Sequence, residues 1–240
     1  MIIYPAIDLR NGRVVRLREG DPARQTIYSD DPLTTAQQWI DAGAEWIHMV
    51  NLDGAFAQAN DNLRIVERTA RLGAAVQFGG GLRSEDDIAT ALAAGAARVV
   101  LGTAAVENRE LVRRAVERWG KEHICVALDA RNGRVATRGW QQVTELSPID
   151  LGQQMAALGV IHALYTDVSR DGGLQGVNLE ATIALGRSTR LNVIASGGLT
   201  TADEIRALAV SGYVAGAVIG TALYEGRLSL ADALSAAQGE

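Results

Sequence analysis

The stretch "GGLRSEDDIATALAAGAARVVLGTA" (residues 80–104) returns later in the chain as "GGLTTADEIRALAVSGYVAGAVIGTA" (residues 197–222). The two copies lie 117 residues apart, and 118 apart after one inserted residue. A second pair, "DLRNGRV" (8–14) and "DARNGRV" (129–135), matches at six of seven positions with an offset of 121 residues. These separations are close to half of the 240 residues, so the sequence predicts two copies of one half.

Short β-rich runs alternate along the chain with longer segments of helical period. The short runs are almost entirely apolar, as expected for strands that are covered on both faces. Ser84 with Asp87, and Thr201 with Glu204, are typical of capping boxes at helix starts. The eight expected strands lie at residues 2–8, 46–51, 75–79, 98–102, 123–129, 161–167, 192–197 and 215–220.

Eight strand–helix units in a chain of 240 residues fit a closed (β/α)8 barrel, the TIM barrel of the α/β class. The alternative is an open, doubly wound sheet, which gives no reason for a repeat at half the chain length. Two half-barrels, approximately residues 1–120 and 121–240, would give the barrel an internal two-fold repeat. No linker or low-complexity tract interrupts the chain, so we predict a single domain over residues 1–240.

The composition is that of an ordinary globular protein, with 48% apolar and 21% charged residues. The net charge of −5 without a basic run argues against nucleic acid or an anionic membrane as a partner. The single Cys125 excludes an internal disulfide and suits a reducing compartment. The chain shows neither a signal-peptide pattern nor an apolar run of membrane-spanning length. We therefore expect a cytoplasmic protein with a small-molecule substrate, and an acidic, patch-free sequence is compatible with a monomer.

The repeat places two matched sets of glycine and threonine at strand ends. The active site of a TIM barrel lies at the C-terminal ends of its strands. Glycines there let backbone N–H groups approach an anion, and a following helix N-terminus adds positive potential. Turn geometry alone is the competing explanation, but two matched sets favour two phosphate sites and an elongated bisphosphate ligand. The residues are Gly80, Gly81, Gly102 and Thr103 in the first half, and Gly197, Gly198, Gly220 and Thr221 in the second.

The repeated aspartates, Asp8 and Asp129, end the first and fifth expected strands, which are opposed in an eight-stranded barrel. Two carboxyl groups can supply a general base and a general acid if their surroundings separate their pKa values. An Asp before Arg-Asn-Gly also suits an Asx-turn that caps its own loop. That alternative explains one Asp well, but explains less readily why both halves place it at the barrel mouth.

The long loops after these two strands carry further ligand candidates. Arg16 and Arg138 are the arginines that we assign to the ligand, since most loop arginines are solvated. Trp140, in "RGW", suits stacking on a heteroaromatic ring beside a guanidinium group. His48 occupies a position in its strand that could face the barrel mouth.

The remaining reactive side chains give no sign of metal or Schiff-base chemistry. His123 and His162 begin strands at the far end of the barrel. The three histidines lack spaced carboxylate partners, so no metal site is expected. The one lysine, Lys121, does not lie at a strand end, which argues against a Schiff-base enzyme.

Five stretches together resemble a known family, the phosphoribosylformimino-aminoimidazole-carboxamide ribotide isomerases of histidine biosynthesis. The resemblance covers essentially the whole chain. It implies a (β/α)8 half-barrel-repeat enzyme that uses neither metal nor organic cofactor. It also implies an Amadori rearrangement, in which a phosphoribosyl aldose becomes the phosphoribulosyl ketose. The stretches are "YPAIDLRNGRVVRL" (4–17), "QFGGGLRSEDDI" (77–88), "LDARNGRVATRGW" (128–140), "YTDVSRDG" (165–172) and "IASGGL" (194–199).

The resemblance also implies roles for individual residues. It makes Asp8 the proton acceptor and Asp129 the proton donor, with Asp171 as an alternative acid. It adds Thr166 to the catalytic residues. Ligand contacts follow for the loop residues Arg83, Trp140 and Gly173.

One position departs from the family pattern. The family usually has "VDLDGA" after the second strand, and this chain has "VNLDGA". Asn51 cannot ionise, so a carboxylate role there is in doubt, whereas its repeat partner Asp167 keeps the acid.

Three other functions remain open from the residues. The sister cyclase barrel of imidazole glycerol phosphate synthase shares both Asp positions, but its usual "CLD" strand and its loop lysine are absent here. A broadened isomerase would also accept phosphoribosylanthranilate, of tryptophan biosynthesis. A non-catalytic barrel would only bind a phosphorylated metabolite.

Overall fold

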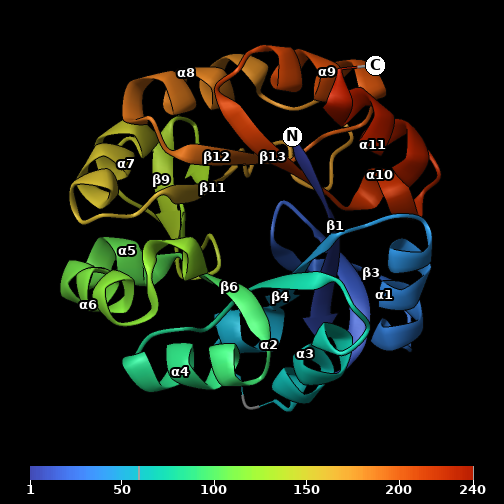
Figure 1. The fold of residues 1–240 in the computed structure, drawn as a ribbon, viewed down its shortest axis with the longest axis horizontal. Helices are drawn as coiled ribbons and strands as arrows, with labels where there is room; N and C mark the ends of the chain where they lie inside the picture. The colour runs from blue at the N-terminus through green and yellow to red at the C-terminus, as the bar shows by residue number, and fades with distance from the viewer. Residues whose placement is uncertain (59, 240) are drawn as a thin grey trace.

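The computed structural model of the chain, which describes residues 1–58 and 60–239, is a closed barrel of eight parallel strands inside a ring of helices (Figure 1). Strand β1 pairs in parallel with β13 on one side and with β4 on the other, which closes the sheet. The predicted TIM barrel is therefore confirmed, and the open sheet is wrong. The two-half repeat and the single domain over 1–240 stay predictions, and residues 59 and 240 of that range lie outside the described residues.

All eight expected strands are present in the barrel. In chain order they are β1 (Ile2–Arg10), β4 (Trp46–Asn51), β5 (Ala75–Gly79), β6 (Ala96–Leu101), β7 (Ile124–Ala127), β11 (His162–Thr166), β12 (Asn192–Ser196) and β13 (Val214–Ile219). The helices are α1 (Pro32–Asp41), α2 (Leu52–Ala55), α3 (Asn62–Ala70), α4 (Glu85–Ala93), α5 (Thr103–Glu107), α6 (Arg109–Trp119), η1 (Lys121–His123), α7 (Pro148–Ala157), α8 (Leu179–Thr189), α9 (Ala202–Val210), α10 (Thr221–Tyr224) and α11 (Leu230–Gln238).

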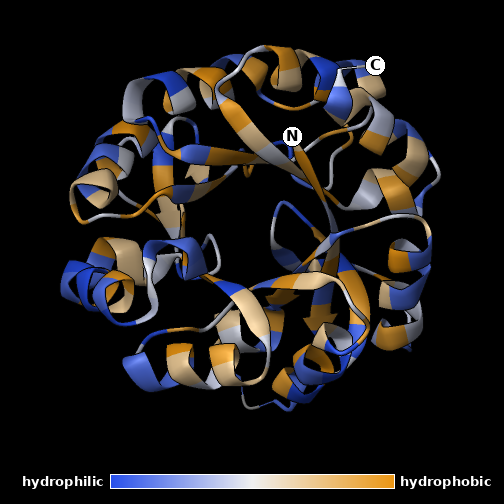
Figure 2. Ribbon diagram, viewed as in Figure 1, coloured by the Kyte–Doolittle hydropathy of each residue, from blue (hydrophilic) through white to orange (hydrophobic). Residues whose placement is uncertain are grey.

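The alternation of side chains along β1 shows how the strands position the site. Ile3 and Ile7 belong to the large core between the strands and the helices, whereas Tyr4 and Ala6 belong to a smaller cluster inside the barrel. Successive side chains on a strand point to opposite faces, so Asp8 follows Tyr4 and Ala6 into the interior. The apolar strands and the mixed helices are visible in Figure 2.

Both predicted capping boxes are present. At the start of α4 the Ser84 hydroxyl accepts from the Asp87 backbone N–H, and Asp87 accepts from the Ser84 N–H. Thr201 and Glu204 do the same at the start of α9. Each box satisfies backbone donors that the first turn of a helix leaves unpaired.

The two long loops of the sequence analysis contain β-structure that we did not predict. After β1 the chain forms an antiparallel hairpin of β2 (Arg13–Arg18) and β3 (Asp21–Ser29), and β2 pairs with the end of β1. After β7 it forms β8 (Ala130–Arg131), β9 (Arg134–Thr137) and β10 (Gln142–Val143). These hairpins stand at the C-terminal end of the barrel and form part of the cavity wall.

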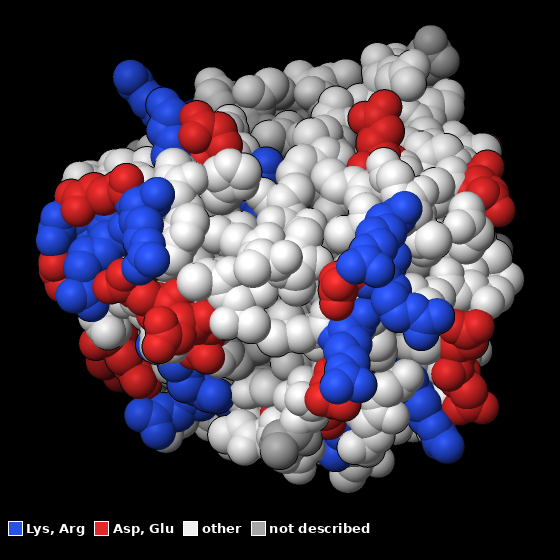
Figure 3. Space-filling view, turned by 60° about the horizontal axis from the view of Figure 1, so that its bottom comes forward, with Lys and Arg blue, Asp and Glu red and all other residues white. Residues whose placement is uncertain are grey.

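Charged side chains of both signs lie beside one another on the face shown in Figure 3. Arg113 pairs with both Glu110 and Glu117 along α6, and Arg114 and Arg118 of the same helix pair with Glu85. Exposed pairs of this kind contribute little to stability. No helix in the described part of the chain has the length and apolar character needed to cross a membrane.

Candidate active site

A cavity opens at the C-terminal ends of the barrel strands, and a smaller cavity adjoins it. Arg16 and Asp171 line both, whereas the predicted Gly173 lines neither. The other predicted residues of the larger cavity are Asp8, His48, Gly80, Gly81, Arg83, Gly102, Thr103, Asp129, Arg138, Trp140 and Thr166. Those of the smaller cavity are Gly197, Gly198, Gly220 and Thr221.

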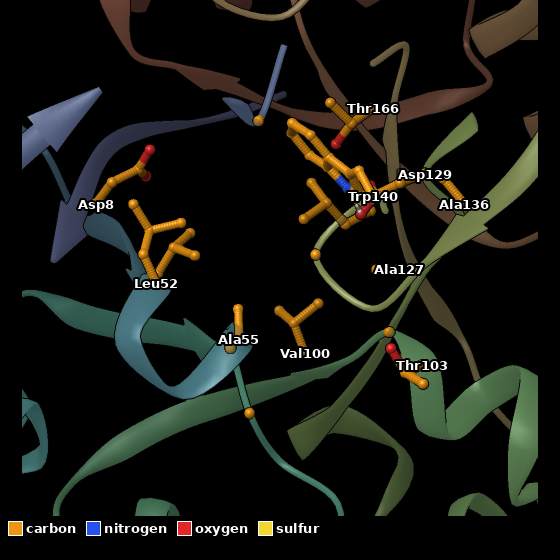
Figure 4. Close-up of a pocket in the computed structure, with 18 of the residues that line it drawn as sticks. Asp8, Leu52, Ala55, Val100, Thr103, Ala127, Asp129, Ala136, Trp140 and Thr166 are labelled. Carbon is orange, nitrogen blue, oxygen red and sulfur yellow. Dashed lines mark hydrogen bonds between the residues drawn. The ribbon is translucent and has the colours of Figure 1, made fainter. Parts of the chain in front are cut away.

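Asp8 and Asp129 lie on opposite walls of the larger cavity (Figure 4). Asp8 comes from the end of β1, and Asp129 follows β7 beside Trp140 and Thr166. The Asx-turn alternative is not what the described hydrogen bonds show, because each carboxylate interacts with a side chain distant in sequence. The two aspartates therefore face a common space.

Arg16, on the hairpin strand β2, ties Asp8 to Asp171. Its Nη1 lies 2.8 Å from Oδ2 of Asp8, and its Nη2 lies 3.6 Å from Oδ1 of Asp171. Burial opposes the charge on Arg16, but the two carboxylates hold its pKa above the usual range. A Cβ at Gly220 would lie 2.5 Å from Cζ of Arg16, so only glycine leaves room for the guanidinium group there. Arg16 thus lies between the two cavities, and its positive charge interacts with both Asp8 and Asp171.

Asp129 has no cation beside it among the described ion pairs. Its Oδ2 accepts a hydrogen bond of 2.8 Å from the indole N–H of Trp140. Its Oδ1 is buried and has no hydrogen-bond partner in the described part of the chain, and the nearby Thr166 lowers the pKa of the carboxyl group. Trp140 itself has a positive φ of 66° and packs its ring against Gly20 of the first hairpin. The two hairpins therefore meet over Asp129.

Burial raises the pKa of both aspartates into the range useful for proton transfer. It raises the pKa of Asp8 to about 6, although Arg16 opposes the shift. It raises the pKa of Asp129 to about 6 against the hydrogen bond from Trp140 and the contact with Thr166. Burial also raises the pKa of Asp171, and Arg16 lowers it. A carboxyl group with a pKa near neutral can act as an acid or as a base.

The glycine turns after β5 and β12 have the same geometry. Gly80 and Gly197 have φ values of 102° and 85°, which L-residues rarely adopt. A Cβ at Gly80 would lie 2.3 Å from the carbonyl oxygen of Asn51, and one at Gly197 would lie 2.7 Å from that of Asp167. Both turns therefore need glycine for conformation and for space, and both leave backbone N–H groups at the cavity wall.

Asn51, the residue that departs from the family pattern, is a hydrogen-bond acceptor in the structure. Its Oδ1 accepts from the backbone N–H of Gly54 at 3.0 Å and from Nδ2 of Asn62 at 2.8 Å. Asp167 accepts from Nδ2 of Asn178 at the same distance of 2.8 Å. An amide oxygen serves this purpose as a carboxylate does, so the helix cap at β4 needs no charge.

Two of the predicted ligand arginines make other contacts. Arg138 donates its backbone N–H to the Thr103 hydroxyl at 2.9 Å, while its guanidinium Nε lies 3.0 Å from Glu107. Arg83 donates to the carbonyl oxygen of Gly54 at 3.2 Å. Both arginines line the larger cavity, but neither guanidinium group faces a carboxylate at the centre of that cavity.

The sequence analysis missed two polar residues in the barrel interior, Gln77 and Arg98. Both are buried, and they link to His48 through hydrogen bonds. The available signal was their position, since a polar residue inside a strand that is otherwise apolar on both faces requires a partner. Among the described residues no group of three or more His, Cys, Asp or Glu side chains could hold a metal ion.

Comparison with known proteins finds relatives over nearly the whole chain. Residues 2–229 match the protein family described as "Histidine biosynthesis protein". A protein of Moorella thermoacetica is 47% identical over 99% of this chain and 98% of its own length. A protein of Syntrophomonas wolfei is 46% identical over all of both chains, and one of Dinoroseobacter shibae is 48% identical over 98% of each.

All three relatives bear the name 1-(5-phosphoribosyl)-5-((5-phosphoribosylamino)methylideneamino) imidazole-4-carboxamide isomerase. Their names refer neither to a phosphoribosylanthranilate substrate nor to a cyclase, so these comparisons give no support to either alternative. The family match spans nearly the whole barrel, including both hairpins and both cavities. The chain belongs to the histidine biosynthesis protein family.

Proposed function

We propose that this chain catalyses the isomerisation for which its relatives are named, as an Amadori rearrangement of the phosphoribosyl aldose to the phosphoribulosyl ketose. The observation that carries the proposal is the pair of carboxyl groups, Asp8 buried and Asp129 partly buried, on opposite walls of one cavity. Asp8 and Asp129 each have a pKa raised to about 6. The rearrangement needs one group to donate a proton and one to accept a proton on the same sugar.

The two glycine-lined regions suit the two phosphate ends of such a substrate. One region lies at Gly80, Gly81, Gly102 and Thr103 in the larger cavity. The other lies at Gly197, Gly198, Gly220 and Thr221 in the smaller cavity. The Thr221 hydroxyl is buried and has no hydrogen-bond partner in the described part of the chain, so it is free to donate to a phosphate oxygen. The reacting sugar would lie between these regions, beside the carboxyl groups.

The charges around the aspartates support a division of labour. Arg16 lies 2.8 Å from Asp8 and favours its ionised form, which can remove the proton on C2 of the sugar. Asp129 lacks a cation partner among the described ion pairs, so no neighbouring positive charge favours its ionised form. A protonated Asp129 can donate to the ribose ring oxygen as the ring opens.

Asp171 is the alternative acid, because it also lines the cavity and its pKa is raised by burial. It shares Arg16 with Asp8, at 3.6 Å, and this cation favours its ionised form. The electrostatic arrangement therefore ranks Asp129 above Asp171 as proton donor.

Trp140 would leave Asp129 to stack on the aromatic ring of the ligand.

The proposal is tested by incubating the purified chain with the aldose in deuterium oxide and following the reaction by proton NMR. The expected result is loss of the C2 hydrogen signal of the reacting ribose and growth of the ketose signals. A barrel that only binds phosphorylated metabolites leaves the aldose unchanged, and so does a cyclase. The same incubation with phosphoribosylanthranilate determines whether the chain accepts a second aldose.

A further inference from the structure

Three polar side chains on adjacent strands form a connected row inside the barrel. His48 on β4 is in register with Gln77 on β5, and Gln77 is in register with Arg98 on β6. All three are buried. His48 is the end of the row that lines the larger cavity. The row therefore leads from the barrel interior to the candidate active site.

The hydrogen bonds along this row have a fixed direction. Arg98 can only donate, and its Nη1 lies 3.2 Å from Oε1 of Gln77. The Gln77 amide must therefore turn its oxygen to Arg98 and its NH₂ group to His48. Nε2 of Gln77 lies 3.1 Å from Nδ1 of His48. Because an amide NH₂ group is a donor, Nδ1 of His48 has to accept.

We propose that Gln77, held by Arg98, is a positioning residue that fixes His48 as the neutral tautomer with its proton on Nε2. In the described part of the chain, Nε2 of His48 has no hydrogen-bond partner, and its side chain borders the cavity. His48 thus presents one N–H donor to an oxygen of the ligand. The inference rests on the proposed function only for the identity of that ligand.

The same arrangement excludes His48 from proton transfer. Forming the imidazolium would place a second proton on Nδ1, against the NH₂ group of Gln77. Burial, with a contribution from Arg16, lowers the pKa of His48 to about 3 and acts in the same direction. The proton chemistry is thereby left to the carboxyl groups, and His48 acts as a fixed dipole.

Arg98 is itself held on several sides. Its Nη1 donates to the Tyr4 hydroxyl at 3.1 Å, and its Nε donates to the carbonyl oxygen of Glu122 at 3.2 Å. Its guanidinium group lies over the ring of Trp46, 4.6 Å from the ring centre. No carboxylate pairs with it among the described ion pairs. These contacts anchor the donor that orients Gln77.

The second half of the barrel shows that the fold does not require this polar row. Leu164 on β11 is in register with Ile194 on β12, and Ile194 is in register with Gly216 on β13. The sequence repeat pairs these three positions with His48, Gln77 and Arg98, at offsets of 116, 117 and 118 residues. In the second half of the barrel, residues without polar side chains thus occupy the layer that is equivalent to the polar row. Burying the polar groups of the first half costs free energy of desolvation. This cost favours a functional role for the polar row.

The test is the protonation state of the His48 ring nitrogens, measured by long-range proton–nitrogen NMR on ligand-free protein labelled with ¹⁵N-histidine. The chain has three histidines, so His48 can be assigned by substitution of the other two. We expect Nδ1 to be unprotonated and Nε2 to be protonated across neutral pH. A proton on Nδ1, in either the other tautomer or the imidazolium, would overturn the proposal.

Two variants give matched readouts of the orienting contact. Gln77→Glu replaces the NH₂ donor by a carboxylate oxygen, and we expect Nδ1 of His48 to become protonated. Tyr4→Phe removes one other hydrogen bond of Arg98 and keeps those to Gln77 and Glu122, so it should leave Nδ1 unprotonated. An unprotonated Nδ1 in Gln77→Glu would show that Gln77 does not set the tautomer. If the wild-type tautomer is as stated but the aldose is not converted, the proposed function fails while the positioning role of Gln77 stands.

Discussion

Among the candidate site residues, Asp129 has surroundings that disfavour a negative charge and supply no cation to compensate it. It is partly buried, it lacks a cation partner among the described ion pairs, and its buried Oδ1 lacks a hydrogen bond. Asp8 is buried, but Arg16 compensates its charge. A repeated sequence motif therefore supplies two carboxyl groups with different electrostatic surroundings. This difference could not be predicted from the motif, because Arg16 reaches Asp8 only through the pairing of β1 and β2.

The buried charge of Asp129 should cost stability at high pH. Its pKa is raised from 3.8 to about 6 in the folded chain, so its contribution to stability is complete below about pH 4 and is lost as the pH rises through about 6. Asp129→Asn should therefore exceed wild type in free energy of unfolding above about pH 7, by up to about 3 kcal/mol. Below about pH 4 the difference should vanish. Urea unfolding at both pH values measures it.

The matched control for this comparison is Asp30→Asn, at an exposed aspartate that pairs with Arg13 on the surface. It should change the free energy of unfolding little at either pH, as is usual for exposed pairs. If the Asp129→Asn difference were the same at high and low pH, the buried carboxyl group would not be its source.

Trp140 should tune the acidity of Asp129. Its indole N–H donates to the carboxylate and so favours the ionised form. Trp140→Phe keeps an aromatic ring but removes the donor, and the pKa of Asp129 should rise. With Asp129 as the acid, kcat/KM should then persist to higher pH than in wild type. The pH profile of kcat/KM is the measurement, with Trp119→Phe as a control outside the cavity. Superimposable profiles for Trp140→Phe and wild type would remove Trp140 from this role.

At the scale of elements, the sequence predicted the eight barrel strands and both capping boxes, and it missed the hairpins. The strands were predictable because both of their faces are buried and their residues are apolar throughout. The strand β2 reads "RVVRLR", and its charged residues led us to expect a loop. Its pairing depends on the extension of β1 to Arg10, beyond the barrel. Such tertiary pairing leaves only a weak local signal.

The glycine turn after β5 should tolerate no side chain. Gly80 and the exposed-turn Gly73 have similar φ values of 102° and 107°, but a Cβ at Gly73 would meet nothing within 4 Å. Alanine at either position should cost of order 1–3 kcal/mol for the backbone conformation. Gly80→Ala should cost more, because the carbonyl group of Asn51 must also move. Urea unfolding of both variants measures the loss in free energy of unfolding. Equal losses for the two variants would mean that the turn has room for a methyl group.

The first of the proposed phosphate regions can be probed at Gly102. The nearest atom to an added Cβ would be that of Ala127 at 3.7 Å, an ordinary contact distance. Gly102→Ala therefore adds an uncharged methyl group and serves as the steric control. Gly102→Asp would bring a carboxylate to the anion region and should raise KM by about 100-fold, the scale of an unfavourable like-charge contact of several kcal/mol. Similar KM values for the two variants would argue against a phosphate at this position.

At the scale of the whole molecule, the barrel brings residues from the two ends of the chain to two adjoining cavities. Asp8 comes from the first strand, and Thr221 follows the last. The sequence repeat predicted which strand ends would carry the site, because equivalent strands of the halves are opposed in a closed barrel. It could not predict that the two glycine-lined regions belong to adjoining cavities with Arg16 between them. That arrangement depends on where the first hairpin folds back.

In the proposed reaction, Asp8 removes a proton from an aldose held between two phosphate regions. The most direct test is kcat for wild type and Asp8→Asn on the aldose, with a binding constant for each protein. Asn is nearly isosteric with Asp and can still accept from Arg16, but it cannot take the proton. We expect turnover by wild type, a loss of about 10²–10⁴-fold in kcat for the variant, and a far smaller loss of affinity. Near wild-type kcat in Asp8→Asn, or a loss confined to binding, would contradict this role of Asp8.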